Sequence, residues 1–328
     1  MTKRPIVVVG SINMDLVVRA ARIPAAGETR LGSGFAMHAG GKGANQAVAV
    51  ARLGWPVEMV GMLGGVSGNP DAMGAALHAH LASEGVGMGG VGIAEAATGV
   101  ALITVADGGE NTIVVAQGAN AMLTPERVEA EAARLRGAGM VLAQLEIPLE
   151  TVLRVAEICA EARVPLMLDP APARALPEPL FPLVTWMTPN ETEAAFYAGL
   201  GRDGALHDSA PRGCALRDTA LLDAGAIAAT LQGRGVAGVV VKLGERGAFL
   251  ADGEGYAARV EPFAAEAVDT TAAGDAFNAA FAVGLLEGHS AMEAARFAAA
   301  ATAVSVTRAG AQESMATRDE VMRRMAAG

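Results

Sequence analysis

The sequence predicts a doubly wound α/β fold, in which a mainly parallel sheet is flanked by helices. Short runs rich in β-branched residues recur along the chain, and several are apolar on both faces, which is typical of strands buried in a parallel sheet. Amphipathic helical patterns alternate with these runs. The 328 residues, of which 52% are hydrophobic, are enough for one large α/β domain or two ordinary ones.

Each expected element follows from its local pattern. Thr124 as N-cap and Pro125 at the first helical position mark the start of one helix. The expected strands cover residues 6–10, 57–63, 140–146, 164–170, 184–190 and 236–244. The expected helices lie within residues 39–54, 124–139, 149–164, 219–235 and 274–288.

Residues 12–36 and 98–118 lack helical patterns and alternate polar with apolar positions. The second segment is expected to form a hairpin that turns at "ADGGEN". We expect the two segments to form a small β-sheet lid over a site, so that the α/β core comprises residues 1–11, 37–97 and 119–328. Residues 201–218 show no clear period and are expected to form a surface loop.

Composition excludes several classes of protein. The net charge of −10 and the lack of a long basic run argue against nucleic acid as the main partner. Cys159 lies in a helical pattern and Cys214 in a polar stretch, which argues against a disulfide framework or a zinc cluster. Asn13 and Asp15 interrupt the apolar start of the chain, which argues against a signal peptide, and no stretch offers about 18 unbroken apolar residues. We therefore predict a cytoplasmic protein without a membrane partner.

Two glycine-rich stretches are candidate binding loops. "AGGKGANQAVAVARLG" (39–54) places glycines before a helix, where free backbone N–H groups can approach polar ligand atoms. It matches neither the Walker A spacing nor the Rossmann fingerprint, and on its glycines alone a plain strand-to-helix turn is equally good. Asn45 favours ligand contact. "KLGERGAFL" (242–250) fits either a β-turn or a loop facing a nucleotide.

Two pairs of polar residues lie at the ends of other expected strands and helices. Asn13 and Asp15 are poor strand residues, so they either form an ordinary turn or hydrogen-bond vicinal hydroxyls. Asn190 and Glu193 have the spacing of a helix capping box, and the same oxygens suit a Mg²⁺ ion that keeps its waters and binds phosphates. On spacing alone, capping is the better explanation.

The stretch "DTTAAGDAF" (269–277) leads small residues directly into a helix whose Phe277, Phe281 and Leu285 share one face. Bare backbone N–H groups and the helix dipole suit an anion or a transferring phosphoryl group. Asp275, in the first turn, is either a general base for a hydroxyl or only a dipole-stabilising charge. From these residues alone, the dipole role is favoured.

Taken together and in this order, the motifs are more specific than any one of them. "GSINMD", "GGKGANQAVAVARLG", "TPNETE" and "DTTAAGDAFNAAF" resemble the ribokinase branch of the ribokinase/phosphofructokinase-B sugar-kinase superfamily. The intermediate stretches "TGVALITV", "GENTIVVAQGAN", "AQLEIPLE" and "VTRAGAQES" are similar to the same branch, so the resemblance spans nearly the whole chain.

This resemblance implies ATP-dependent phosphorylation of the 5-hydroxyl of D-ribose. It makes Asp275 the base, and the backbone N–H groups of Ala272, Ala273 and Gly274 the anion hole for the γ-phosphate. The residues implied to hold the sugar are Asn13, Asp15, Gly41, Lys42, Asn45 and Glu146, together with Asp275.

The resemblance also implies the cofactors and the assembly. Asn190 and Glu193 match positions associated with Mg²⁺ and phosphates, which reverses the preference for simple capping. The ATP would lie along Leu243, Gly244, Glu245, Arg246, Gly247 and Gly274. An activating K⁺ would be held by Asp269, Thr271, Ser305, Arg308, Gly310 and Ser314, mostly through carbonyl groups. The lid strands resemble a dimer-forming flap, so we expect a homodimer.

Three features depart from the family's pattern: the length of residues 201–218, the stretch "GGVSGNPDAMG" (64–74), and Ala299 where a polar residue is common. A kinase of 2-deoxyribose, of another pentose or of a nucleoside remains an alternative. A non-catalytic sugar sensor is a second alternative, against which Asp275 argues. A dinucleotide-dependent dehydrogenase fails because the Rossmann fingerprint is missing.

Overall fold

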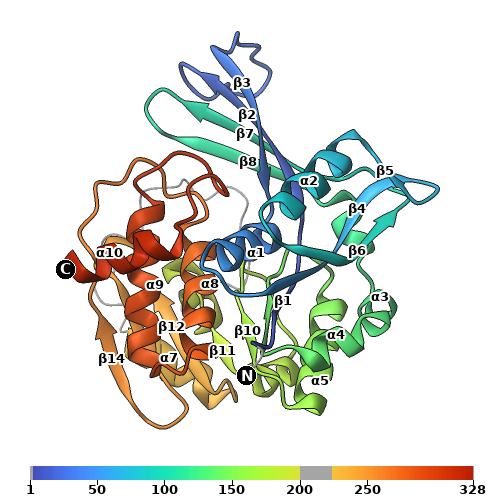
Figure 1. Cartoon of the computed structure of the whole chain (residues 1–328). Helices are drawn as coiled ribbons and strands as arrows, with labels where there is room; N and C mark the ends of the chain where they lie inside the picture. Colours follow the sequence, from blue (N-terminus) through green and yellow to red (C-terminus); the bar gives the residue numbers. More distant parts are fainter. Residues whose placement is uncertain (1–2, 200–223, 328) are drawn as a thin grey trace.

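The computed structural model describes residues 3–199 and 224–327 (Figure 1). Cys214 and the expected surface loop 201–218 lie outside the described residues. Among the described residues, no helix is long and apolar enough to cross a membrane.

A ten-stranded sheet forms the body of the molecule, in the order β14-β13-β12-β11-β10-β9-β1-β4-β5, with β6 also paired to β4. The six strands expected from the sequence are present, and they pair in parallel as β4-β1-β9-β10-β11-β12. Their bounds are β1 Ile6–Val9, β4 Val57–Val66, β9 Met140–Ala143, β10 Leu166–Leu168, β11 Trp186–Met187 and β12 Gly238–Lys242. The others are β5 Asn69–Pro70, β6 Gly87–Ala94, β13 Ala248–Ala251 and β14 Ala257–Val260.

Helices cover both faces of this sheet, as the doubly wound prediction requires (Figure 1). Successive residues of β1 face opposite cores: Ile6 and Val8 belong to one buried cluster, Val7 and Val9 to the other. The first cluster includes α1 Lys42–Arg52, α2 Ala72–Ser83, α8 Ala273–Leu286, α9 Ala291–Ser305 and α10 Arg318–Ala327. The second includes α3 Pro125–Ala130, α4 Ala132–Gly137, α5 Leu149–Ala162, α6 Glu191–Tyr197 and α7 Ala224–Gly233.

The prediction of one continuous helix over residues 124–139 is wrong. Pro125 does begin a helix, but the chain leaves helical geometry at Glu131 (φ −98°, ψ 7°), which separates α3 from α4. The turn there tightens, because Glu131 N–H donates to the carbonyl of Val128 and Arg134 N–H to that of Glu131. With this break, both Val128 and Leu135 remain fully buried in the same core.

The two segments without helical patterns contribute to a second sheet, in the order β3-β2-β7-β8. Its strands are β2 Asn13–Ala20, β3 Gly34–Gly40, β7 Gly99–Ala106 and β8 Asn111–Ala116. The β7–β8 hairpin turns where the sequence predicted it, and β2 pairs with β7 in parallel. Figure 1 shows this sheet projecting from one end of the body. β3 continues to Gly40 and so leads directly into α1.

Candidate active site

A cavity of about 650 Å³ opens at the carboxyl ends of the parallel strands, and the second sheet forms part of its wall. Ala101, Ile103, Ile113 and Val115 line it from β7 and β8. The fold brings most predicted site residues to this cavity, although they come from segments far apart in the chain. They are Asn13, Asp15, Gly41, Lys42, Asn45, Glu146, Asn190, Glu193, Gly244, Gly247, Thr271, Ala272, Ala273, Gly274 and Asp275.

One end of the cavity carries two carboxylates. Asp15 lies on β2, and burial, followed by the charge of Glu146, raises its pKa to about 7. Glu146 accepts hydrogen bonds from the Ser11 hydroxyl and from the backbone N–H of Lys42. Carboxylates held in this way can accept hydrogen bonds from neighbouring hydroxyls of a polar ligand.

Asn13 lies beside these carboxylates and is oriented by Asn120, a residue that the sequence analysis did not predict to be part of the site. Asn120 Nδ2 donates to Asn13 Oδ1 at 2.7 Å, and Asn120 Oδ1 accepts from Ile12 N–H at 2.9 Å. Both amides are buried. With its oxygen taken up, the Asn13 amide group is left with N–H donors to offer the cavity.

Gly41 explains the close approach of α1 to this end. Its φ of +90° favours glycine, and a Cβ there would lie 2.7 Å from the backbone nitrogen of Asn13. The helix therefore starts directly against β2, with Lys42 at its first position.

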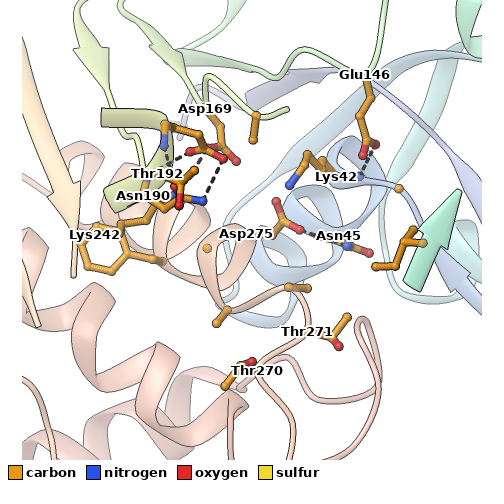
Figure 2. Close-up of a pocket in the computed structure, with 18 of the residues that line it drawn as sticks. Lys42, Asn45, Glu146, Asp169, Asn190, Thr192, Lys242, Thr270, Thr271 and Asp275 are labelled. Carbon is orange, nitrogen blue, oxygen red and sulfur yellow. Dashed lines mark hydrogen bonds and ion pairs between the residues drawn. The ribbon is translucent and has the colours of Figure 1, made fainter. Parts of the chain in front are cut away.

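Asp275 lies in the first turn of α8 and is only 3% exposed. Its carboxylate accepts hydrogen bonds from Asn45 Nδ2 at 3.0 Å and from Gln46 Nε2 at 3.1 Å. Burial raises the pKa of Asp275 above the usual carboxyl range, while Lys42 opposes this rise. Burial alone would lower the pKa of Lys42, but the charges of Asp275 and Asp169 raise it. Figure 2 shows Asp275 between the group around Asp169 and the group around Asn45.

The N-terminus of α8 has the geometry of an anion site. Ala272 is the N-cap in the left-handed region, with φ of 58°, and the turn is closed by the Ala273 N–H, which donates to the Thr270 carbonyl at 3.2 Å. N–H groups in a helix's first turn lack acceptors within the helix, and they point to where an anion would bind. A Cβ at Gly274 would lie 3.1 Å from Lys242 Nζ, so the glycine leaves room for an ammonium group beside these N–H groups.

Asn190 and Glu193 form the capping box that their spacing predicted, at the start of α6. Glu193 is 7% exposed, and burial raises its pKa, with the charge of Asp169 adding to the effect. Glu193 and Asp169 both lie on the cavity wall, together with Asn190. Two carboxylates and an amide oxygen are the donors that Mg²⁺ takes when phosphates complete its shell, so these residues fit such an ion.

The residues predicted to hold K⁺ lie mostly behind the cavity, and Thr271 alone among them lines it. Asp269 accepts hydrogen bonds from Thr271 and from Gly310 N–H, which ties the turn before α8 to the loop after α9. Ser305 and Ser314, both buried, share a hydrogen bond of 2.9 Å. Arg308 directs its side chain to Glu320. The turn before α8 and the loop after α9 thus meet at Asp269.

A second cavity of about 620 Å³ adjoins the first and shares Gly244, Gly247 and Thr270 with it. Glu245, Ala299 and Phe263 line it, and its wall is largely apolar. Of the residues expected along the nucleotide, Leu243 and Arg246 line neither cavity; Arg246 pairs with Glu191 instead. The divergent stretch 64–74 touches neither cavity.

The motifs missed an ion pair at the centre of the site. Lys242 Nζ lies 3.2 Å from Asp169 Oδ1, and both side chains are largely buried on the cavity wall (Figure 2). Asp169 directly follows β10, and Lys242 ends β12. Because parallel strands end at the same edge of a sheet, charged residues at the ends of apolar strands were the signal that could have found them.

Comparison with known proteins assigns the chain to a family. The model of the pfkB family carbohydrate kinases matches residues 3–318. The chain is 40% identical over 320 residues to a ribokinase of Bacillus subtilis, with 97% of this chain and 98% of the relative covered. It is 37% identical over 321 residues to a ribokinase of Haemophilus influenzae, with 98% of each covered.

Solved structures show the same likeness. The structure of Arabidopsis thaliana ribokinase complexed with ribose and ATP matches at a TM-score of 0.85 and 34% identity, covering 99% of both chains. Fold and site together define an enzyme of the sugar-kinase class, with a ribokinase-like fold. The chain belongs to the pfkB family of carbohydrate kinases.

Proposed function

We propose that this protein is an ATP-dependent ribokinase that phosphorylates the 5-hydroxyl of D-ribose to give D-ribose 5-phosphate. The observation that carries this proposal is one cavity in which a buried Asp275, the N-terminus of α8 and the carboxylates of Asp15 and Glu146 all converge. The similarity to ribokinases, one of them complexed with ribose and ATP, supports the choice of sugar and of nucleotide.

The sugar binds at the end of the cavity formed by Asn13, Asp15, Gly41, Lys42, Asn45 and Glu146. Carboxylates there accept from the ring hydroxyls, and the Asn13 amide and Lys42 ammonium donate. This orientation directs the 5-hydroxyl to Asp275, and Asn45 acts mainly through its hydrogen bond to that carboxylate.

Phosphoryl transfer is in line. The 5-hydroxyl oxygen forms a bond to the γ-phosphorus as the bond to the β-phosphate oxygen breaks, ADP leaves, and Asp275 takes the hydroxyl proton. Negative charge on the transferring group is stabilised by the N–H groups of Ala272, Ala273 and Gly274. The Ala273 N–H donates to the Thr270 carbonyl in this structure, so it takes part only when that bond is released. Lys42 and Lys242 add positive charge on two sides of Asp275.

Gly244 to Gly247 and the apolar second cavity hold the nucleotide, with Glu245 and Ala299 on its wall. Asn190 and Glu193, with Asp169 beside them, would hold Mg²⁺ through water, and a bound Mg²⁺ would supply neutralisation of the phosphate charge. Asp269, Thr271, Ser305, Arg308, Gly310 and Ser314 would surround a K⁺ ion, which would add to the hydrogen bonds of Asp269 in holding the turn before α8.

The proposal includes a homodimer in the cytoplasm. The face of the second sheet that points away from the cavity exposes apolar side chains of Val18, Phe35, Met37, Leu102 and Val114. Such a contiguous apolar face on a projecting sheet supports association through the lid. The lid role of residues 12–36 and 98–118 is part of the same proposal.

The direct test is an assay of ADP release from ATP with a panel of pentoses, hexoses and nucleosides, with and without K⁺. We expect D-ribose to give the highest kcat/KM and K⁺ to increase it. Preference for 2-deoxyribose or a nucleoside would refute ribokinase while keeping the kinase; no turnover with any acceptor would favour the sensor alternative.

Asp275→Asn tests the role of the base. We expect it to lower kcat by at least about 100-fold, because general bases typically contribute 10²–10⁴-fold, and to leave ribose affinity within a few-fold of the wild type. Isothermal titration calorimetry with ribose measures the affinity, and steady-state kinetics measure kcat. Asp319→Asn, an exposed carboxylate in the first turn of α10, is the matched control and should change neither. A variant at position 275 that keeps more than about a tenth of the rate would contradict the role.

A further inference from the structure

The carboxylate of Asp275 is held by two side-chain amides from adjacent positions of α1. Asn45 Nδ2 donates to Oδ2 at 3.0 Å, and Gln46 Nε2 donates to Oδ1 at 3.1 Å. Asn45 is 6% exposed and Gln46 1% exposed, so water competes little with either bond. Each carboxylate oxygen has two lone pairs, and each therefore keeps one free for a substrate hydroxyl.

A further pair of amides fixes which way these two point. Gln144 Nε2 donates to Gln46 Oε1 at 2.7 Å, and Gln312 Nε2 donates to Asn45 Oδ1 at 3.2 Å. Both outer glutamines are fully buried. An amide carries its acceptor and its donor on opposite sides, so taking up the oxygen of Asn45 or Gln46 leaves the NH₂ group for Asp275.

The hydrogen bonds that run through Gln312 continue to a histidine on α2. His80 Nε2 lies 3.0 Å from Gln312 Oε1. Because the NH₂ group of Gln312 is given to Asn45, the oxygen of Gln312 is the acceptor and His80 Nε2 is the donor. Two series of hydrogen bonds thus lead to Asp275, and in each the donor lies on the side away from Asp275. One series runs from His80 through Gln312 and Asn45, and the other runs from Gln144 through Gln46.

Two features concern the cost in stability of the hydrogen bond from Gln144 to Gln46. Gln144 Oε1 is buried and has no hydrogen-bond partner among the residues that the structure describes. A Cβ at position 10 would lie 2.0 Å from this oxygen, so Gly10 leaves room for the Gln144 amide in this position. An unpaired buried acceptor is unfavourable, and the donor on the same amide is the part that is used.

We propose that Gln46 and Gln312 are positioning residues for the base Asp275: they fix the plane of its carboxylate and keep it ionised by presenting only donors to it. Gln46 acts directly, and Gln312 acts through Asn45. This inference rests on the proposed role of Asp275 as the base.

Other charged groups also act on Asp275. Lys42, from α1, favours its ionised form, whereas Asp169, which follows β10, disfavours it; Asp15, on β2, is a further carboxylate near enough to interact with it. Burial raises the pKa of Asp275, and the hydrogen bonds from Asn45 and Gln46 oppose that rise. Loss of donors therefore moves the pKa further upward.

Gln312→Glu keeps the shape of the side chain but offers an acceptor to Asn45. Asn45 then turns its own oxygen toward Asp275, which favours a protonated carboxyl. We expect the acid limb of kcat/KM to move to higher pH by about one unit or more, and kcat at pH 7 to fall at least about tenfold and to recover at higher pH. Gln46→Met, which removes a donor without adding an acceptor, should move the limb in the same direction by less.

Gln232→Glu is the matched control, because the Gln232 side chain donates to the carbonyls of Ala237 and Asp252, far from the site. It should leave the pH profile unchanged. A merely structural role of Gln46 and Gln312 would lower thermal stability and the active fraction but leave the limb in place, and an unshifted limb in both variants overturns the proposal.

The titration of Asp275 can also be followed without turnover, by ¹³C NMR of aspartate-labelled protein with the signal assigned from Asp275→Asn. A higher pKa in Gln312→Glu than in the wild type supports the positioning role, and equal values refute it. This result stands even if no sugar in the panel is phosphorylated, so failure of the proposed function and failure of this inference remain distinguishable.

Discussion

Asp15 shows how a single site residue can lower the stability of the free protein. Its pKa rises to about 7, mainly through burial and then through the charge of Glu146. A carboxyl group whose pKa is raised by folding binds its proton more tightly in the folded state than in the unfolded state. The free energy of unfolding therefore falls as pH rises from about 4 to about 7, and this loss is complete above the folded-state pKa.

We expect Asp15→Asn to raise the free energy of unfolding at pH 8 by about 1–4 kcal/mol, because one pKa unit corresponds to about 1.4 kcal/mol. The gain should shrink toward pH 5, where Asp15 of the wild type is already neutral in the folded state. Urea unfolding without sugar at several pH values measures it, and Asp319→Asn should show no such gain. A destabilised variant, or a gain that does not depend on pH, would contradict this account. The same variant should bind ribose at least about 100-fold more weakly, as removal of a buried hydrogen-bond partner does.

At the scale of elements, two helices start with the same device but in different places. Asn190 and Glu193 form a capping box on α6 at the cavity, and Ser290 and Glu293 form one on α9. The α9 box lines neither cavity. The pair therefore separates what a cap contributes to stability from what it contributes to catalysis.

Asn190→Ala and Ser290→Ala should each lower the free energy of unfolding by about 0.5–2 kcal/mol, since each removes an N-cap. Only Asn190→Ala should also lower kcat/KM for ATP, by about tenfold or more, because Asn190 lines the cavity and Ser290 does not. Denaturant unfolding and kinetics on both variants test this. If the two variants are equally active, Asn190 serves only as a helix cap, and its proposed role in binding Mg²⁺ is refuted.

At the scale of the whole molecule, the site lies where the two sheets meet. The main sheet ends its parallel strands at the cavity, and β7 and β8 of the second sheet form part of its wall. The other face of the second sheet exposes Leu102 and its register partner Val114, which are 52% and 66% exposed. The second sheet thus has one face on the cavity and the other face apolar and exposed, which is the face through which we propose that two copies associate.

Leu102→Lys should dissociate the proposed homodimer, with the dimer dissociation constant rising at least about 100-fold, because two-fold symmetry places the new charge in the interface twice. Sedimentation velocity over a range of concentrations measures it. Met322→Lys, on α10 and equally exposed, should leave the association unchanged. A wild type that is monomeric at all concentrations would refute the dimer.

The sequence predicted well where the cause is local. Val7 and Val8 lie in a run that is apolar on both faces, and that run becomes a strand with a core on each side. Asn190 and Glu193 carry their capping geometry in their spacing. The prediction of one helix over 124–139 failed because its periodic pattern is continuous and carries no sign of the break at Glu131. Near this break, Arg134 pairs with Glu58 on β4, a contact between distant segments, as well as with Glu131.

The site divides in the same way. Glycines, small residues and the first-turn position of Asp275 are local properties of motifs, so they could be read in order along the chain. The Lys242–Asp169 pair and the amides around Asp275 join residues that no local pattern relates: Gln46 is 229 positions from Asp275, and Gln312 is 267 positions from Asn45.

The sequence alone determined the alternation of strands and helices, the family and many of the residues that line the cavity, among them Asp15, Glu146 and Asp275. The tertiary structure alone decided the direction of the hydrogen bonds on Asp275, the pKa of Asp15 and the ion pair beside the anion site. These depend on burial and on contacts between distant segments, because the strength of a charge or a hydrogen bond is set by the groups that exclude water around it.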